Sequence, residues 1–211
     1  MPDSMENLSA QLRKGGFIVV YDGDGREGEA DLMFHASFAN PEKIERMRNE
    51  AGGLVCLAID GANAGKIGLK FMGDILRGSG YGKIACKRTA YGDEPAFSLA
   101  INHKGVYTGI TDEDRALTIK KMDECVRAEN PKEYFEGNFY APGHVFLLVG
   151  RGINVRKGHT ELSLELARIA GLSGAMVMCE MLGKGKALAK KDVIEYAKRN
   201  GFPFIEGRDI W

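Results

Sequence analysis

The amino-acid sequence predicts an α+β (mixed α/β) fold in three layers, in which a mixed, twisted sheet carries helices on both faces. Short apolar runs of strand length alternate along the chain with longer stretches whose apolar residues recur at helical spacing. Residues 54–59 are apolar throughout, as in a strand buried on both faces, and residues 144–149 and 174–179 have a similar character. Because strands and helices interleave without a strict repeat, one mixed sheet covered by helices is the simplest arrangement.

In the first half of the chain, glycine and proline mark the ends of the predicted elements. Gly15-Gly16 and Gly52-Gly53 each follow an amphipathic stretch, and glycines in this position end a helix. Pro41 stands at the start of the second stretch, where proline is favoured. The elements expected here are a helix at 4–14, strands at 17–21 and 31–37, a helix at 41–51, a strand at 54–59 and a short helix at 67–72.

In the second half, caps and periodicity define further elements. Thr111 is an N-cap followed by acids, and Ile119, Met122 and Val126 lie on one face of the helix that it starts. A helix from Thr160 is expected to turn Leu162, Leu166 and Ile169 inward and to end at Gly171. The remaining expectations are strands at 97–102, 106–108, 144–149 and 174–179, a loop at 130–141, a helix at 190–199 and an edge strand at 204–205.

The composition limits the classes of protein to which the chain can belong. A length of 211 residues and a hydrophobic fraction of 44% suit one well-buried domain. Lys plus Arg and Asp plus Glu number 29 each, so net charge does not support broad binding to nucleic acid or to an anionic membrane. No apolar run approaches the roughly 20 residues of a membrane span, and the N-terminus lacks the pattern of a signal peptide. We therefore expect a soluble, cytoplasmic protein.

The cysteines are expected to be reduced thiols. They are widely spaced and form no Cys-x-x-Cys pair, so neither a zinc ribbon nor a disulfide framework is indicated. They are Cys56, Cys86, Cys125 and Cys179. Cys56 and Cys179 lie in apolar runs, where the usual role of a thiol is core packing.

An acidic, glycine-rich loop joins the first two predicted strands. Residues 21–31 carry five carboxylates and one arginine among three glycines. Such crowding of like charge is unfavourable unless open water or a bound cation relieves it. The loop is therefore either a solvated hairpin loop or part of a cation site, and a second motif favours the cation site.

The second motif is the segment Arg156-Lys-Gly-His-Thr160, which opens a predicted helix. Two cations, a glycine that permits close approach, a hydroxyl N-cap and the free N–H groups of a helix start together describe a phosphate site. The alternative is an ordinary polar turn with a Thr cap.

His159 among these cations is expected to stay neutral, and a neutral imidazole can bind metal. If the acidic loop folds over this helix start, Glu27 and His159 can share one divalent ion, and the surplus of carboxylate favours Mg²⁺ or Mn²⁺ over structural zinc.

Two further polar groups stand at strand ends. His144 lies where a loop enters a strand, and Glu180 follows the apolar run that ends at Cys179. Either can be a hydrogen-bonded structural group, but Glu180 is the better candidate for proton transfer because a carboxyl on an apolar strand favours its neutral form. His35 and His103 have no such neighbours in the sequence and are interpreted as structural or solvent-facing.

Six motifs in this order resemble the 3,4-dihydroxy-2-butanone 4-phosphate synthases of riboflavin biosynthesis. They are residues 22–31, 53–56, 107–111 with Asp114-Arg115, 142–146, 156–161 and 179–180, and they span nearly the whole chain. Residues 102–104, Asn-His-Lys, make the chain most similar to the stand-alone archaeal form. The resemblance implies a single synthase domain over residues 1–211. The family is often fused to a GTP cyclohydrolase domain, for which this length leaves no room.

The resemblance also implies an activity. The expected enzyme is a Mg²⁺- or Mn²⁺-dependent lyase that converts D-ribulose 5-phosphate to L-3,4-dihydroxy-2-butanone 4-phosphate and formate, through an enediolate, a dehydration and a skeletal rearrangement. Family members are homodimers with sites near the subunit interface, so one site can draw residues from two chains. Neither nucleic acid nor a membrane is an expected partner.

The resemblance also implies roles for the residues of this chain that match the family motifs. Substrate binding is expected from Arg26, Glu27, Asp31, Thr108, Arg156, Lys157, Gly158, His159, Thr160 and Glu180. Metal is expected at Glu27 and His159, and catalysis from His144 and Glu180. We add the hypothesis that Glu29 or Asp31 assists proton transfer. The chain departs from the family pattern at Gly23 and Gly25, because family members often have acidic residues at these positions. This difference affects how the acidic loop closes and how strongly it attracts metal.

Two other functions use some of the same parts. A non-catalytic module that binds sugar phosphate, nucleotide or RNA needs the phosphate loop but not Glu27, His144 and Glu180. A metal-dependent sugar-phosphate isomerase or aldolase can use the same groups as far as the enediolate. The order of the six motifs favours the synthase.

Overall fold

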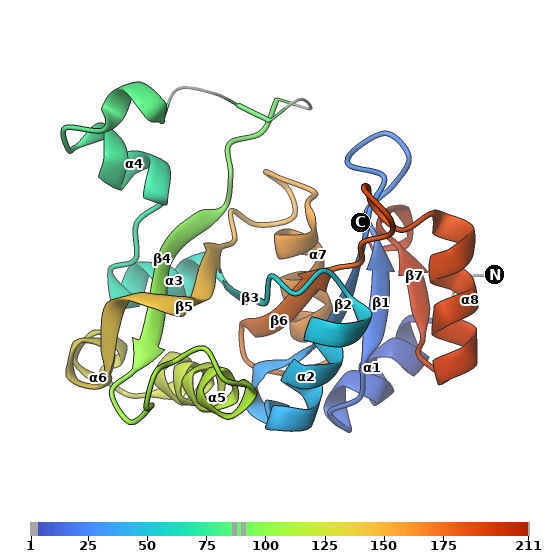
Figure 1. Ribbon diagram of the computed structural model, residues 1–211, viewed down its shortest axis with the longest axis horizontal. Coiled ribbons are helices and arrows are strands. Elements are labelled where there is room, and N and C mark those ends of the chain that lie inside the picture. The colour runs from blue at the N-terminus through green and yellow to red at the C-terminus, as the bar shows by residue number, and fades with distance from the viewer. Residues whose placement is uncertain (1–3, 86–87, 90–91, 211) are drawn as a thin grey trace.

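Seven strands form one mixed sheet at the centre of the molecule (Figure 1). The computed structural model describes residues 4–85, 88–89 and 92–210, and the strands within this part are β1 Ile18–Tyr21, β2 Ala30–His35, β3 Cys56–Ile59, β4 Phe97–His103, β5 Phe139–Val149, β6 Ala175–Glu180 and β7 Phe204–Glu206. Their order across the sheet is β4-β5-β3-β6-β2-β1-β7. β3 pairs with β5, and β1 with β7, in parallel, while the other neighbours are antiparallel. The predicted mixed sheet is confirmed.

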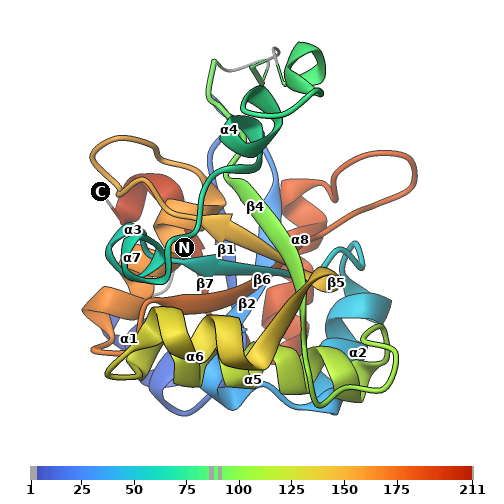
Figure 2. The same cartoon turned by 90° about the vertical axis from the view of Figure 1, so that its left-hand side faces the viewer.

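Helices cover both faces of this sheet, as predicted. They are α1 Met5–Arg13, α2 Pro41–Glu50, α3 Gly61–Ile67, α4 Met72–Arg77, α5 Asp112–Arg127, α6 Pro131–Asn138, α7 His159–Ile169 and α8 Lys190–Asn200. Figure 2 shows α1 and α7 on one side of the sheet and α2 and α8 on the other. Three short 3₁₀ helices complete the described elements, at Ala36–Phe38, Gly82–Ile84 and Gly207–Asp209.

A separate apolar core stabilises each face. Leu8 of α1 and Leu162 of α7 are fully buried on one face, and Ile44 of α2 and Ile119 of α5 are fully buried on the other. Burying one such side chain contributes about 2 kcal/mol to folding. The two cores hold the helices in three layers and so fix α7 against the sheet.

The strand register places several polar residues at one end of the sheet. Asp31 of β2 is paired with Glu180 of β6, and Cys56 of β3 is paired with Met178. Directly paired residues of an antiparallel ladder project from the same face. The β1–β2 hairpin brings the acidic loop to this end as well, because Tyr21 pairs with Ala30.

Five local predictions were wrong. The helix expected at 67–72 is instead the connection between α3 and α4, because Gly68 ends α3 with φ +88°. No strand forms at 106–108, because the carboxylate of Asp114 accepts hydrogen bonds from the backbone N–H groups of Tyr107, Thr108 and Gly109 and holds them in a turn.

The other three errors concern α6 and α7. Residues 130–141 contain α6, which starts at Pro131 in the N-terminal position that proline favours. Ile169 is 37% exposed rather than turned inward. The helix expected to start at Thr160 starts at His159, and its N-cap, Gly158, makes no side-chain cap hydrogen bond.

Two smaller points complete the fold. Cys56, Cys125 and Cys179 are buried free thiols, as expected, whereas Cys86 lies outside the described residues. Within the described part of the chain, no helix has both the length and the apolar character needed to span a membrane.

Candidate active site

The acidic loop is folded on itself by a buried carboxylate. Asp22, which is 1% exposed, accepts hydrogen bonds from the backbone N–H groups of Glu27 at 3.0 Å and Glu29 at 3.1 Å. The reversal is completed at Gly28, whose φ of +68° is readily adopted only by glycine. The loop is therefore an ordered turn, and it directs the side chains of Glu27 and Glu29 toward the start of α7.

His159 lies at the point where this loop meets α7. Its Nε2 is 3.2 Å from the backbone oxygen of Glu29 and 3.7 Å from Asp31 Oδ1, and its Nδ1 is 3.6 Å from Glu27 Oε2. The predicted approach of Glu27 to His159 is present.

The expectation that His159 stays neutral is wrong. Burial lowers the pKa of His159, but the carboxylates of Asp31, Glu27 and Asp22 outweigh burial and raise the pKa to about 9. The acidic loop, rather than the cations of the helix start, dominates the field at the ring. The imidazolium accordingly neutralises part of the crowded negative charge.

Asp31 is a buried carboxylate of this group, with 2% of the residue exposed. Burial, followed by the charges of Glu180, Glu27 and Glu29, raises its pKa to about 7 against the opposing effect of His159. Its Oδ1 accepts no hydrogen bond from the described residues. Burial and the nearby charges of Glu180 and Glu27 also raise the pKa of Glu29. Asp31 can therefore exchange protons near neutral pH.

A cavity of about 460 Å³, here called the carboxylate cavity, opens onto these groups. Its polar lining consists of Glu27, Glu29, Asp31, Thr89, Arg156, His159, Thr160 and Glu180. Leu148, Met178 and Cys56 form part of its apolar wall. Burial raises the pKa of the Cys56 thiol, so this side chain is a neutral wall group rather than a thiolate nucleophile. Glu180 lies exposed at the end of β6, within the cavity wall.

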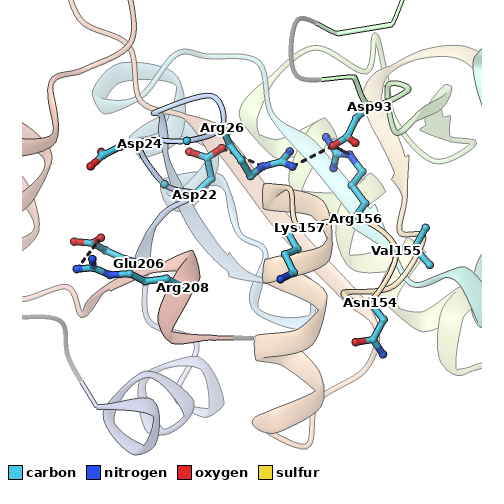
Figure 3. A pocket seen from close by; sticks show the side chains of 12 residues that line it. Asp22, Asp24, Arg26, Asp93, Asn154, Val155, Arg156, Lys157, Glu206 and Arg208 are labelled. Atoms are coloured by element: carbon cyan, nitrogen blue, oxygen red, sulfur yellow. Dashed lines mark hydrogen bonds and ion pairs between the residues drawn. The ribbon is translucent and has the colours of Figure 1, made fainter.

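Arg26 and Arg156, here called the arginine pair, meet at a single carboxylate. Asp93 Oδ2 lies 3.1 Å from Arg26 Nη1 and 3.3 Å from Arg156 Nε (Figure 3). The buried Arg156 is also held by Glu161, with Nη1 2.7 Å from Oε2. The pair lines a second cavity of about 560 Å³, here called the arginine cavity.

The phosphate loop predicted from sequence is thus only partly as expected. Figure 3 shows Arg156 directed toward Asp93, whereas Lys157 points the other way from the loop. Gly158 is the N-cap of α7, and Thr160 lies inside the helix instead of capping it. The cationic character of the site comes from the combination of Arg156 with Arg26 of the acidic loop.

Thr108 and His144 lie in a second cluster, outside both cavities. The backbone N–H of His144 donates to Asn102 Oδ1 at 2.9 Å, and the Asn102 amide also contacts the His144 ring. Gly109 packs so closely on Asn102 that an added Cβ would lie 2.0 Å from its Nδ2. Within one chain, these two predicted site residues are therefore near each other but are not residues of either cavity wall.

Two overlapping groups of ligand atoms fit a hard divalent cation. Asp22, Glu27 and His159 form one group and Glu27, Glu29 and Glu180 the other, each with its atoms within 4.8 Å of one another. Oxygen-rich sets with one imidazole match the preferences of Mg²⁺ and Mn²⁺. Glu27, predicted from sequence as a metal ligand, is the member common to both groups.

Sequence reasoning missed three residues of the site. Asp22 was recognised as part of the acidic loop, but nothing in the sequence indicated that its carboxylate folds the loop by accepting hydrogen bonds within it. Glu161 was named only as the last residue of a motif. Asp93 lies in a stretch without periodicity, so no sequence signal pointed to it.

Comparisons with known proteins agree with the geometry. A family model described as 3,4-dihydroxy-2-butanone 4-phosphate synthase matches residues 6–211. The chain is 41% identical to the Archaeoglobus fulgidus protein of this name, over 99% of this chain and 92% of that one. It is 39% identical to the protein of this name from Methanothermobacter thermautotrophicus, over 94% of this chain and 90% of the relative. A crystal structure of a 3,4-dihydroxy-2-butanone 4-phosphate synthase in complex with two magnesium ions is similar with a TM-score of 0.80, at 25% identity, over 98% of this chain and 94% of that chain.

Proposed function

The chain belongs to the 3,4-dihydroxy-2-butanone 4-phosphate synthase family, and we propose that the groups around Glu27 and His159 are its catalytic centre. As a member of this family it converts D-ribulose 5-phosphate to L-3,4-dihydroxy-2-butanone 4-phosphate and formate in riboflavin biosynthesis. The family match favours this activity over the isomerase, aldolase and non-catalytic alternatives. The observation that carries the proposal is the convergence of Glu27, Asp31, His159 and Glu180, from separate segments, on one cavity.

We propose that Glu27 and His159 hold a divalent cation, Mg²⁺ or Mn²⁺, and that the cation displaces the ring proton of His159 when it binds. Glu29 and Glu180 provide carboxylates for a second ion beside Glu27. The two magnesium ions in the similar crystal structure support this arrangement. When bound, such an ion stabilises negative charge on the vicinal oxygens of the sugar.

Proton transfer is assigned to Asp31, with Glu29 and Glu180 as neighbouring acids. The reaction removes a proton from C3 of the sugar, eliminates water at C1, and releases C4 as formate after rearrangement of the skeleton. Asp31 Oδ1 faces His159 inside the protein and accepts no hydrogen bond from the described residues, so it is available to a substrate proton. Its position in the terminal pair of the β2–β6 ladder, opposite Glu180, holds the acid in place through successive transfers.

The substrate phosphate is assigned to the arginine pair and the start of α7. Arg26 and Arg156 already converge on one carboxylate, and a phosphate presents more oxygens and more charge to the same guanidinium groups. The N–H groups after Gly158 add the positive end of the helix. Anchoring the phosphate here leaves the rest of the sugar to extend toward the carboxylate cavity, since Arg156 lines both cavities.

The assembly is proposed to be a homodimer in which Thr108 and His144 of one chain complete the site of the other. Exposed apolar side chains surround this second cluster: Tyr107 is 96% exposed, Ile110 53% and Tyr140 41%. An exposed apolar group of this kind is typical of a protein interface. A second copy of the chain is the occupant that would bring His144 to a catalytic centre. The single domain over residues 1–211 and the cytoplasmic location stay predictions.

The activity is tested by formate release from ribulose 5-phosphate. With Mg²⁺ present, we expect one formate for each substrate consumed, and EDTA should abolish the release. Formation of pentose isomers without formate would instead support an isomerase. Binding of ribulose 5-phosphate without any turnover would contradict the catalytic assignment.

A further inference from the structure

Asp93 contributes a carboxylate to the arginine pair from outside the acidic loop and α7. It lies in the segment that leads into β4, whereas Arg26 belongs to the β1–β2 hairpin loop and Arg156 precedes α7. The Asp93 carboxylate contacts both guanidinium groups through the same oxygen, Oδ2. Figure 3 shows the Asp93 carboxylate beside the ends of Arg26 and Arg156.

Three other carboxylates contact the pair: Glu27, which lies 3.8 Å from Arg26 and 3.9 Å from Arg156 and is assigned to the metal, and Asp22 and Glu161, which are held by backbone groups. Asp22 accepts hydrogen bonds from the N–H groups of Glu27 and Glu29, and Glu161 accepts one from the N–H of Arg151 at 3.0 Å. Asp22 and Glu161 are also each 1% exposed. They are structural counter-ions that cannot move without unfolding the local backbone.

Asp93 is held differently. Its side chain is 28% exposed, and its hydrogen bond to Arg26 joins two side chains. The backbone of Asp93 is fixed independently, because its carbonyl oxygen accepts hydrogen bonds from Thr89 N at 2.9 Å and from Thr89 Oγ1 at 3.0 Å. The carboxylate can therefore rotate into solvent while the main chain stays in place.

The charge at the pair indicates what happens when a phosphate arrives. The two guanidinium groups already face Asp93, Glu27 and the fixed carboxylates of Asp22 and Glu161. While Asp93 remains in place, the pair therefore has no excess of positive charge to offer to a further dianion. A phosphoryl group seeks the same guanidinium N–H donors that Asp93 uses. Both anions cannot occupy that position, because like charges in contact repel each other strongly in a partly buried site.

We propose that Asp93 is a resident anion of the phosphate site: it holds the arginine pair together when substrate is absent and yields its place to the phosphoryl group when substrate binds. This inference rests on the assignment of the substrate phosphate to Arg26 and Arg156. Asp93 is then a specificity-determining residue, because every phosphorylated ligand must displace it. The same exchange aids release of the product, which still carries the phosphate.

The test measures binding of inorganic phosphate to the purified full chain by calorimetry at constant ionic strength. Asp93→Asn keeps the shape of the side chain but removes its charge. We expect the variant to bind phosphate about tenfold more tightly than the wild type, as when one like charge is removed from an anion site. Asp93→Glu, which keeps the charge, should bind like the wild type. The KM for ribulose 5-phosphate should fall in Asp93→Asn, whereas loss of a merely structural contact would raise it.

Two further variants show whether the phosphate that is measured binds at the arginine pair. Glu94→Gln makes the same charge change one residue away, where the carboxylate lies 3.9 Å from Arg77 and from Arg151, and should leave phosphate binding unchanged. Arg26→Met removes one member of the arginine pair and should weaken phosphate binding. If Arg26→Met weakens binding but Asp93→Asn does not tighten it, the resident-anion role is refuted and the phosphate assignment stands. If phosphate binds equally well to Arg26→Met, or fails to bind to both wild type and Asp93→Asn, the phosphate assignment fails and the inference with it.

Discussion

Asp31 Oδ1 lies 3.7 Å from Nε2 of His159, and this contact joins the start of β2 to the start of α7. The two residues come from positions more than one hundred residues apart, and the contact exists because the core beneath α7 presses the helix onto β2. On the other side of Asp31, the ladder places Glu180 as its direct partner. Asp31 therefore sits between an imidazole and a carboxylate, the environment that an acid–base residue requires.

Replacement of this acid tests its assigned role. Asp31→Asn preserves the shape of the side chain and should lower kcat by roughly 10²–10⁴-fold, the range of general acid–base catalysis, with little change in KM. Formate release measures kcat. Asp24→Asn is a suitable control, because Asp24 belongs to the same loop but pairs with Lys190 and is 79% exposed. Equal turnover in Asp31→Asn and wild type would contradict the assignment.

Removal of Glu27 tests the metal centre directly. Since Glu27 belongs to both groups of ligand atoms, Glu27→Gln should weaken Mn²⁺ binding by at least about 100-fold, more than the loss of an outer-shell partner. Binding can be followed by the electron paramagnetic resonance signal of free Mn²⁺, independently of activity. Glu165→Gln changes a carboxylate of α7 that pairs with Arg168 and should leave binding unchanged. Retention of wild-type affinity in Glu27→Gln would place the metal elsewhere.

The sequence was sufficient to predict the layers, the order of most strands and helices, and the two motifs that form the centre. The hairpin of residues 17–37 and the helix after Arg156 each follow from local periodicity and turn residues, so their positions needed no tertiary information. Their approach to each other was expected only on the condition that the loop folds over the helix. The structure meets this condition: hydrogen bonds to the buried Asp22 fold the loop, and Glu27 of the folded loop lies beside His159 of the helix.

Two features of the site could not be predicted because residues distant in the sequence decide them. The charge of His159 depends on Asp31 and Glu27, which lie far away in the sequence, so the adjacent cations were a poor guide. Asp93 acquires its partners only through the path of the chain after α4. Local patterns carry no information about such contacts.

His35 gives the fold a pH dependence that is separate from the active site. Its ring accepts a hydrogen bond from the Ser37 N–H and donates one to the Ser173 carbonyl, while Asp123 and Arg127 lie nearby with opposite charges. Burial lowers the pKa of His35 in the folded state below the unfolded value of about 6.5. Below that pH the unfolded chain binds a proton that the folded chain refuses, so the stabilisation present above it is lost as pH falls.

A substitution that cannot titrate isolates this effect. Between pH 7.5 and 5.0, the free energy of unfolding of His35→Asn should fall by less than that of the wild type, with a difference on the order of 1 kcal/mol. Urea unfolding at the two pH values gives both quantities. The variant will also be less stable at pH 7.5, because it loses hydrogen bonds, so only the change with pH is diagnostic. An identical change in both proteins would remove His35 as the cause.

Two inactive variants test whether the sites are shared between subunits. Glu27→Gln damages the catalytic centre of its own chain, whereas His144→Ala removes a group that we assign to the site of the partner. In a mixed dimer of the two variants, one of the two sites has both groups intact and the other has neither. When equal amounts of the two variants are unfolded, mixed and refolded, half of the dimers are mixed, and one site in each mixed dimer is intact. The mixture should therefore regain about a quarter of the wild-type activity. If His144 acts within its own chain, every site stays damaged and the mixture remains inactive. The control is each variant taken alone through the same unfolding and refolding, which should regain no activity in either case.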